Sequence, residues 1–332
     1  MYNWNKSIID EQIKYLERIE SKTELIIEDI ETLKETRKNI VNNYSYKYEL
    51  SQENYDYNFL KKYNVILNPI IKKHINKVVL YRNLKLNKIN ISKKDILIFT
   101  QDMIRDINKD WFNTLLPFFY DKNILKYKSN ISNYVVPIKS INKYYISLSK
   151  HNNVKDFIIP IHEYLHIYNH IKNDSNSFFM ENEFLSILGE LIVSYEMKEQ
   201  NLFKEDVLKL SLINYRDMLY FIKDTNLRKE LIRNKLSNKE KIYYVKHKYN
   251  EYINDVYSAS LFYHYDTIIS YFIAIELFNI YLRDKEKCMY LCDQLIKDNS
   301  FLNTKLRKYN INLLDHDEEY FKTLKKEYDE FK

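Results

Sequence analysis

The chain has 332 residues, of which 45% are hydrophobic, and its 52 basic and 46 acidic residues give a net charge of +6. Its single glycine, Gly189, excludes dinucleotide-binding and phosphate-binding loops of the standard kind, because each needs several glycines close together. With one glycine and four prolines, the chain has few residues that end helices or form tight turns, so we expect a mainly α-helical fold.

The sequence shows no signal for secretion, membrane insertion or nucleic-acid binding. The N-terminal residues carry no apolar segment of a secretory signal peptide, and no apolar run reaches the ~20 residues that span a bilayer. The charges are interleaved and form no basic stripe of the kind that binds nucleic acid. Cys288 and Cys292 are too few for a disulfide framework and are predicted to be reduced core thiols. We therefore expect a cytoplasmic protein that contacts neither membrane nor nucleic acid.

Residues 7–43 are predicted to form one long helix, as a helical arm or as half of a helical hairpin. Apolar residues recur three or four positions apart, and the segment contains neither glycine nor proline. A coiled-coil homodimer through this helix is an alternative, although its heptad is irregular. Residues 44–58 would form the turn before a second helix over 59–85. The predicted division is a helical arm or hairpin over 1–64 and a larger domain over 65–332, which carries the candidate site.

The next predicted helix begins after Ser92, a residue type that caps helix N-termini. Residues 131–149 are rich in Val, Ile, Tyr and Ser and contain Pro137, which predicts two short strands in a hairpin. Helical periodicity returns at about residue 154 and continues nearly to the C-terminus. The predicted fold is therefore a mainly α domain with a small β-hairpin or sheet beside one of its helices.

The sequence His162-Glu163-Tyr164-Leu165-His166 lies near the start of the first helix after these strands. Because helix residues four apart share a face, His162 and His166 can bind one zinc ion. Glu163, beside the first ligand, can take a proton from a water molecule that this ion activates. The flanking residues are apolar, so these polar groups lie in or beside a core, where metal binding relieves the cost of burying them. The pattern predicts a zinc site with Glu163 as general base.

The third zinc ligand has several candidates. His170 lies ~12 Å along the helix axis from His162, too far to share one metal, and is expected at the surface or beside the ligands. A second amphipathic helix carries Glu183 and Glu190, which are seven apart and share a face. Glu181 is less well placed, near the helix start, where the helix dipole favours an acid in any case. We favour Glu183 as the third ligand and Glu190 as the group that orients a histidine.

These residues resemble the thimet oligopeptidase and oligoendopeptidase F family of zinc metallopeptidases. In that family the H-E-x-x-H helix is followed by a helix with Glu-x-x-Ser-x-x-x-Glu, and Glu183, Ser186 and Glu190 match this pattern in register. The resemblance covers roughly residues 65–300 and implies that Glu183 binds zinc. The chain departs from the family in having Leu165 where the family usually has glycine. It is also much shorter than family members.

The resemblance also implies roles for a downstream segment and an upstream strand. Tyr263-His264-Tyr265-Asp266 is similar to the family segment that supplies phenol and imidazole donors to the substrate carbonyl. Tyr265 and His264 are therefore candidates to stabilise the developing oxyanion, with Tyr263 and Tyr271 as rivals. The strand at 144–149 looks like the family's edge strand, which can bind an extended peptide by backbone pairing.

The leading hypothesis from the sequence is a zinc-dependent endopeptidase that hydrolyses oligopeptides, with the peptide substrate as its partner. One alternative is a non-catalytic peptide-binding protein with a structural or vestigial zinc site, since a structural zinc has a fourth protein ligand. Another is a helical interaction protein that dimerises through residues 7–43, in which case the H-E-x-x-H match is accidental.

Overall fold

The computed structural model describes most of the chain from residue 63 onward. The described residues are 63–77, 83–120, 125–129, 131, 133–138, 143–172, 183–233, 265–298 and 300–331, together with Ile13, Lys14, Glu17, Ile30, Glu31 and Lys34. None of their helices is both long enough and apolar enough to cross a membrane.

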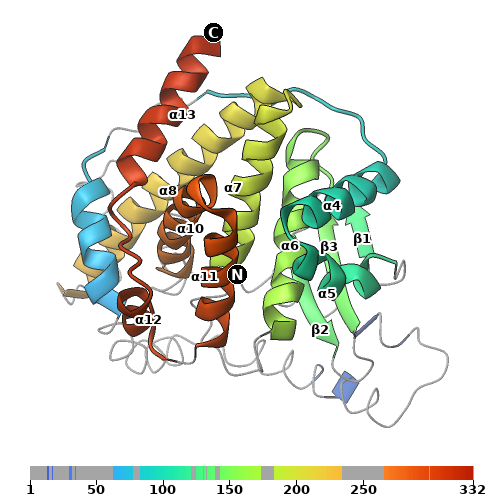
Figure 1. Ribbon diagram of the computed structural model, residues 1–332, viewed down its shortest axis with the longest axis horizontal. Helices are drawn as coiled ribbons and strands as arrows, with labels where there is room; N and C mark the ends of the chain where they lie inside the picture. Colours follow the sequence, from blue (N-terminus) through green and yellow to red (C-terminus); the bar gives the residue numbers. More distant parts are fainter. Residues whose placement is uncertain are drawn as a thin grey trace.

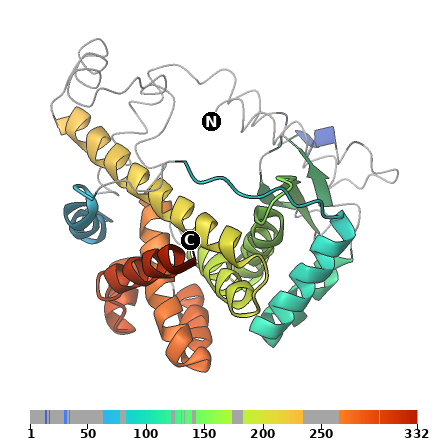
Figure 2. The same cartoon turned by 90° about the horizontal axis from the view of Figure 1, so that it is seen from above.

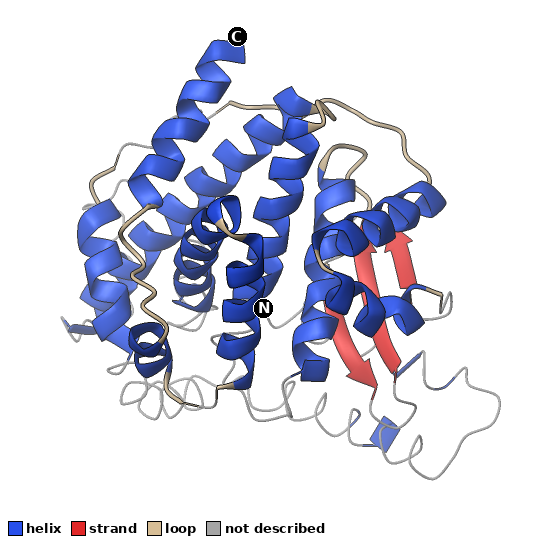
Figure 3. Cartoon of the chain, viewed as in Figure 1, coloured by secondary structure: helices blue, strands red, loops and turns tan. Residues whose placement is uncertain are grey.

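Helices make up most of the described structure, as the composition predicts (Figures 1 and 3). One helix covers residues 63–74. The others are α4 (Lys93–Ile107), α5 (Lys109–Phe119), α6 (Lys155–Lys172), α7 (Phe184–Glu199), α8 (Lys204–Arg233), α10 (Tyr265–Arg283), α11 (Lys285–Lys297), α12 (Leu302–Lys308) and α13 (Asp317–Phe331).

The helices α6 and α7 lie side by side in the middle of the molecule. On one side α6 packs against α4, α5 and the sheet, and on the other α7 packs against α8 and α10. Seen from above, the sheet, α4 and α5 lie on one side of the molecule and α10 to α13 on the other (Figure 2). One hydrophobic core extends through both halves and includes Trp111, Tyr164 and Phe272, each 1% exposed or less.

The boundaries of α4 and α5 are set by polar caps. The Ser92 side chain accepts a hydrogen bond from the backbone of Asp95, as predicted for an N-cap residue. Asn108 ends α4 and caps α5, since its side chain accepts from the backbone N–H groups of Asp110 and Trp111. These caps satisfy donors that have no partner within their own helix.

A three-stranded sheet has the order β1-β3-β2, with β1 at Leu125–Lys128, β2 at Tyr134–Ile138 and β3 at Lys143–Ser149. The antiparallel pairing of β2 and β3 confirms the two strands predicted over 131–149. The parallel pairing of β1 with β3 was not predicted, because four residues are too few for a periodicity to show. The prediction that the strand at 144–149 is an edge strand is wrong, since β3 is paired on both sides.

Tyr168 fixes α6 against its neighbours. Its hydroxyl lies 2.7 Å from a carboxylate oxygen of Asp110 on α5 and 3.2 Å from one of Asp293 on α11. Lys172, one turn further along α6, lies 3.0 Å from Asp110 and balances its charge. Cys288 and Cys292 on α11 are free and buried, which confirms the predicted core thiols.

The N-terminal prediction of one helix over 7–43 is wrong. Glu17 and Lys34 are both helical, and the Lys34 ammonium lies 2.8 Å from the Glu17 carboxylate. In a continuous helix, 17 residues would separate them by about 25 Å along the axis. The predicted turn over 44–58 and the dimer through this region lie largely outside the described residues. The division between residues 64 and 65 stays a prediction, and the helix over 63–74 runs across it.

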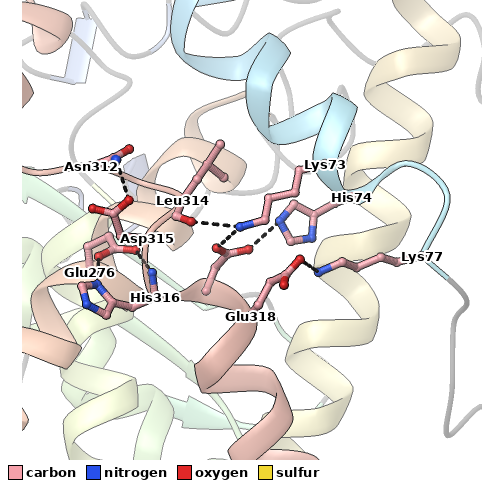
Figure 4. A network of polar contacts seen from close by, with 10 residues as sticks. Lys73, His74, Lys77, Glu276, Asn312, Leu314, Asp315, His316 and Glu318 are labelled. Carbon is pink, nitrogen blue, oxygen red and sulfur yellow. Dashed lines mark hydrogen bonds and ion pairs between the residues drawn. The ribbon is translucent and has the colours of Figure 1, made fainter.

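A buried polar network attaches the start of α13 to the helix over 63–74 (Figure 4). Asp317, fully buried, lies 2.6 Å from the Lys73 ammonium and 2.8 Å from the Nε2 atom of His74. We call these three residues the α13 clasp. Beside it, Glu276 on α10 accepts a hydrogen bond from the backbone N–H of His316. Glu276 therefore interrupts the apolar pattern of its helix in order to hold the chain just before α13.

Candidate metal centre

Two helices bring the predicted ligands together. His162 and His166 lie one turn apart on α6, and Glu183 immediately precedes α7, where its backbone carbonyl accepts from the N–H of Ile187. The Glu183 side chain makes no capping hydrogen bond to its own helix. Its carboxylate faces the two imidazoles of α6 instead. The helix packing therefore places Glu183, one of the candidates ranked from the sequence, beside both histidines.

The three side chains converge on one point. The Nε2 atoms of His162 and His166 are 3.0 Å apart, and Glu183 Oε2 lies 3.4 Å from the first and 3.5 Å from the second. Among the described residues they are the one group of three or more His, Cys, Asp or Glu placed to hold a metal ion. The two imidazoles and one carboxylate predicted from the sequence thus lie together.

The ligand atoms fit zinc in type and in spacing. Zinc binds imidazole nitrogen at ~2.0–2.1 Å and carboxylate oxygen at ~2.0–2.2 Å, in tetrahedral geometry. Tetrahedral geometry at such bond lengths separates ligand atoms by about 3.3–3.5 Å. The observed separations of 3.0, 3.4 and 3.5 Å therefore need little adjustment to hold the ion.

Glu190 supports the first ligand from behind. Its Oε1 atom lies 2.7 Å from Nδ1 of His162, on the side of the ring opposite the Nε2 atom that faces Glu183. A carboxylate on the distal nitrogen fixes the tautomer and the orientation of a metal-binding imidazole. Glu183 and Glu190 thus contact the two nitrogens of one ring, as their seven-residue spacing on one face allows.

Glu163 is the buried carboxylate of the site. It is 4% exposed, and its Oε2 atom is buried with no hydrogen-bond partner among the described residues. Its pKa is raised to about 8, mainly by burial and also by the charges of Glu183 and Glu190, while His162 opposes the rise in part. A carboxylate buried without a partner is costly, so its place beside the ligands calls for a functional explanation.

The charges within the centre act on each other. Burial lowers the pKa of His162, but Glu183 and Glu190 outweigh it, and the net shift is well upward. Burial raises the pKa of Glu183, yet the neighbouring His166 and His162 bring it down to about 2. In both cases the carboxylates favour positive charge at the imidazoles, which is the electrostatic condition for binding a cation.

Comparison with known proteins supports the fold. No protein-family model matches the sequence, and no curated protein matches it significantly. Solved structures do match. A protein assigned as an oligoendopeptidase F, from Bacillus anthracis str. Ames, aligns with 82% of this chain and 55% of its own, at 14% identity and a TM-score of 0.54.

Two further structures agree. A protein assigned as a peptidase, from Chlamydophila abortus, aligns with 82% of this chain and 55% of its own, at 12% identity and a TM-score of 0.58. PZ peptidase A aligns with 76% of this chain and 54% of its own, at 13% identity and a TM-score of 0.54. The fold is that of the oligoendopeptidase F-type peptidases. The chain spans about half the length of these structures.

The remaining predicted residues have mixed outcomes. His170 is exposed, and its Nδ1 atom lies 2.8 Å from the Tyr144 hydroxyl, which confirms its predicted place outside the ligand set. Tyr265 begins α10 and is 1% exposed. Tyr271, on the same helix, is also buried, and its pKa is raised mainly by burial and further by charges that include Glu190. His264, Tyr263 and Glu181 lie outside the described residues.

Sequence reasoning missed one residue of the site's framework. Gly189, the residue before Glu190, has a Cα so close to α6 that an added Cβ would lie 2.2 Å from a methyl carbon of Leu165. Its being the single glycine of the chain was a signal that it fills a special position. The periodicity of α7 could not show which helix it faces.

Proposed function

We propose that this chain is a zinc-dependent endopeptidase that hydrolyses peptide bonds of oligopeptides. The observation that carries the proposal is the convergence of His162, His166 and Glu183 within 3.5 Å of one another, beside a buried carboxylate that has a free oxygen. The fold shared with solved peptidase structures supports it.

The zinc ligands are His162, His166 and Glu183. Zinc, when bound by three protein groups, acts as a Lewis acid toward water and toward a substrate carbonyl. Among the described residues no fourth His, Cys, Asp or Glu joins this group. A structural zinc site is closed by four protein ligands, whereas a catalytic one has three, so the ligand count favours a catalytic role over the structural alternative.

Glu163 has the role of general base. Its unpaired Oε2 can accept a proton from the attacking water and pass it to the leaving amine. Glu190 orients the His162 ring through Nδ1. Tyr265 and His264 are proposed donors to the oxygen of the scissile carbonyl, where charge develops in the transition state. If the H-E-x-x-H motif were accidental in a helical interaction protein, the position of the Glu183 carboxylate beside two histidines would have no explanation.

The direct test is Glu163→Gln. The amide keeps the size of the side chain but cannot take a proton, so we expect kcat/KM for a fluorogenic peptide to fall roughly 10²–10⁴-fold. Zinc content should stay at the wild-type level, because Glu163 is not a ligand. The control is Glu199→Gln, at the exposed end of α7. Full activity in Glu163→Gln, or cleavage by the wild type that survives a chelator, would contradict the mechanism.

A further inference from the structure

Gly189 of α7 packs directly against Leu165 of α6. A Cβ added to Gly189 would lie 2.2 Å from Cδ1 of Leu165 and 3.5 Å from Cγ2 of Ile161. Ordinary contacts between carbon atoms are about 3.5–4.0 Å. Leu165 and Ile161 are both fully buried. The leucine side chain therefore occupies the space in which any larger residue of α7 would place its first carbon.

These contacts lie one position away from three groups of the metal centre. Ile161 and Leu165 immediately precede His162 and His166 on α6, and Gly189 immediately precedes Glu190 on α7. Residues four apart on α6 share a face, so the Gly189 contact lies against the same two turns that carry both imidazoles. Glu183 and Glu190 contact His162 across the same interface between α6 and α7, so a change in helix spacing at Gly189 also changes these contacts.

We propose that Gly189 is a positioning residue, whose missing side chain leaves room for Leu165 and so allows the α6–α7 spacing on which the zinc affinity of the site depends. This inference rests on the proposed function, because it assumes that zinc is the ion bound. Moving from 2.2 Å to an ordinary contact requires more than ~1 Å of displacement. A functional site tolerates only about 0.5 Å, and the ligand atoms already stand at tetrahedral spacing.

The clash could also be relieved without moving the two helices apart. Leu165 could instead rotate its methyl group away from α7. It is 0% exposed and lies in the continuous core, with Ile161 one turn before it on the same face. A buried leucine has few rotamers compatible with its helix and its neighbours. The added carbon therefore either displaces α7 or forces Leu165 into another rotamer, and the zinc affinity distinguishes the two outcomes.

The experiment measures the zinc Kd of the purified full chain by competition with a chromophoric chelator, together with the Tm of the zinc-free protein. The variants are Gly189→Ala, Leu165→Ala and the double variant. Gly189→Ala should weaken zinc binding about 10-fold or more, the range seen when groups that support a metal site are disturbed. Leu165→Ala should lower the Tm, because it leaves a cavity, yet keep near wild-type zinc affinity. The double variant should regain that affinity.

The two single variants separate positioning from general damage. If both lose stability but only Gly189→Ala loses zinc affinity, the spacing of the helices is responsible. Unchanged affinity in Gly189→Ala, or a double variant that stays weak, overturns the proposal. If Gly189→Ala alone does not fold, recovery of folded, zinc-binding protein in the double variant is the expected result, and an unfolded double variant overturns the proposal. A wild-type chain without zinc binding overturns the proposed function, and this inference with it.

Discussion

Two buried clusters in this molecule contain histidine and carboxylate side chains, and they differ in how their charges are balanced. In the α13 clasp, Asp317 is paired with the Lys73 ammonium at 2.6 Å and with His74 at 2.8 Å. In the metal centre, two histidines meet three glutamates, Glu163, Glu183 and Glu190. The charges that shift the pKa values of His162, Glu163 and Glu183 belong to the cluster itself.

The difference separates a structural cluster from a functional one. A buried carboxylate needs a cation or a set of hydrogen bonds, and the clasp has its cation in Lys73. Among the described residues of the metal centre, no lysine or arginine contributes to the pKa shift of Glu163 or of Glu183. Three carboxylates and two imidazoles gathered without such a cation support the proposal that this cluster binds a metal ion. Substitutions in one cluster should therefore leave the function of the other unchanged.

The largest effect is expected for His162→Ala. Removing one of three ligands should reduce the zinc content of the purified protein from about one ion per chain to nearly none, with loss of peptide hydrolysis. The measurement is elemental analysis after dialysis, read beside cleavage of a mixed peptide pool.

The matched control is His170→Ala, on the same helix. His170 is exposed and contacts Tyr144, so this variant should keep its zinc. Equal zinc loss in the two variants would show that damage to α6, and not loss of a ligand, explains the result. Full zinc content in His162→Ala would remove the basis of the proposed function.

The sequence predicted the convergence of His162, His166 and Glu183 better than the rest of the molecule, because the information for it is local. The four-residue spacing of His162 and His166 and the seven-residue spacing of Glu183 and Glu190 each describe one face of one helix. The resemblance placed the two helices together, and the structure brings their side chains within 3.5 Å. The same reasoning predicted a mainly helical fold and the two strands beside α6.

What the sequence could not predict depends on contacts between distant segments. The ion pair between Glu17 and Lys34 contradicts one helix over 7–43, although the apolar spacing of the segment suits a continuous helix. The position of β3 between two strands depends on β1, which is too short to recognise. Leu165, a departure from the usual glycine, is explained only by Gly189 on the neighbouring helix.

A smaller but still large effect is expected for Asp317→Asn, now in the α13 clasp. The amide cannot balance the Lys73 charge, and removing one member of a buried ion pair costs about 3–5 kcal/mol of the free energy of unfolding. Zinc content should not change, because the clasp shares no residue with the metal centre. Urea unfolding and zinc analysis of the same preparation measure both.

The control for this variant is Glu318→Gln, the next residue in the first turn of α13. Its side chain is 48% exposed and lies 3.5 Å from Lys77, so the loss should stay below about 1 kcal/mol. Both variants remove one negative charge from the same helix N-terminus, so only burial distinguishes them. Similar losses in the two would show that the clasp is no more than a surface ion pair.

The smallest effect concerns the pH dependence of stability that His74 contributes. Burial lowers the pKa of His74 below 6.5; the charges of Lys77 and Lys73 lower it further, and Asp317 opposes them. The unfolded chain takes up a proton at this histidine near pH 6.5 while the folded chain does not. Acidification below pH 6.5 therefore favours unfolding, with a slope of at most about 1.4 kcal/mol per pH unit from one group.

This contribution can be isolated by comparing the wild type with His74→Gln. Asp317, whose pKa is lowered because His74 and Lys73 outweigh the effect of burial, loses its own contribution only below pH 3.8, outside the window. Urea unfolding at pH 7.5 and 5.5, with a chelator present so that the metal centre is zinc-free in both proteins, should show the wild type losing more stability than the variant. All other groups titrate alike in the two chains and cancel in this difference. Equal losses would mean that His74 takes up its proton in the folded state. The clasp would then carry an excess of positive charge, and charge balance would no longer distinguish it from the metal centre.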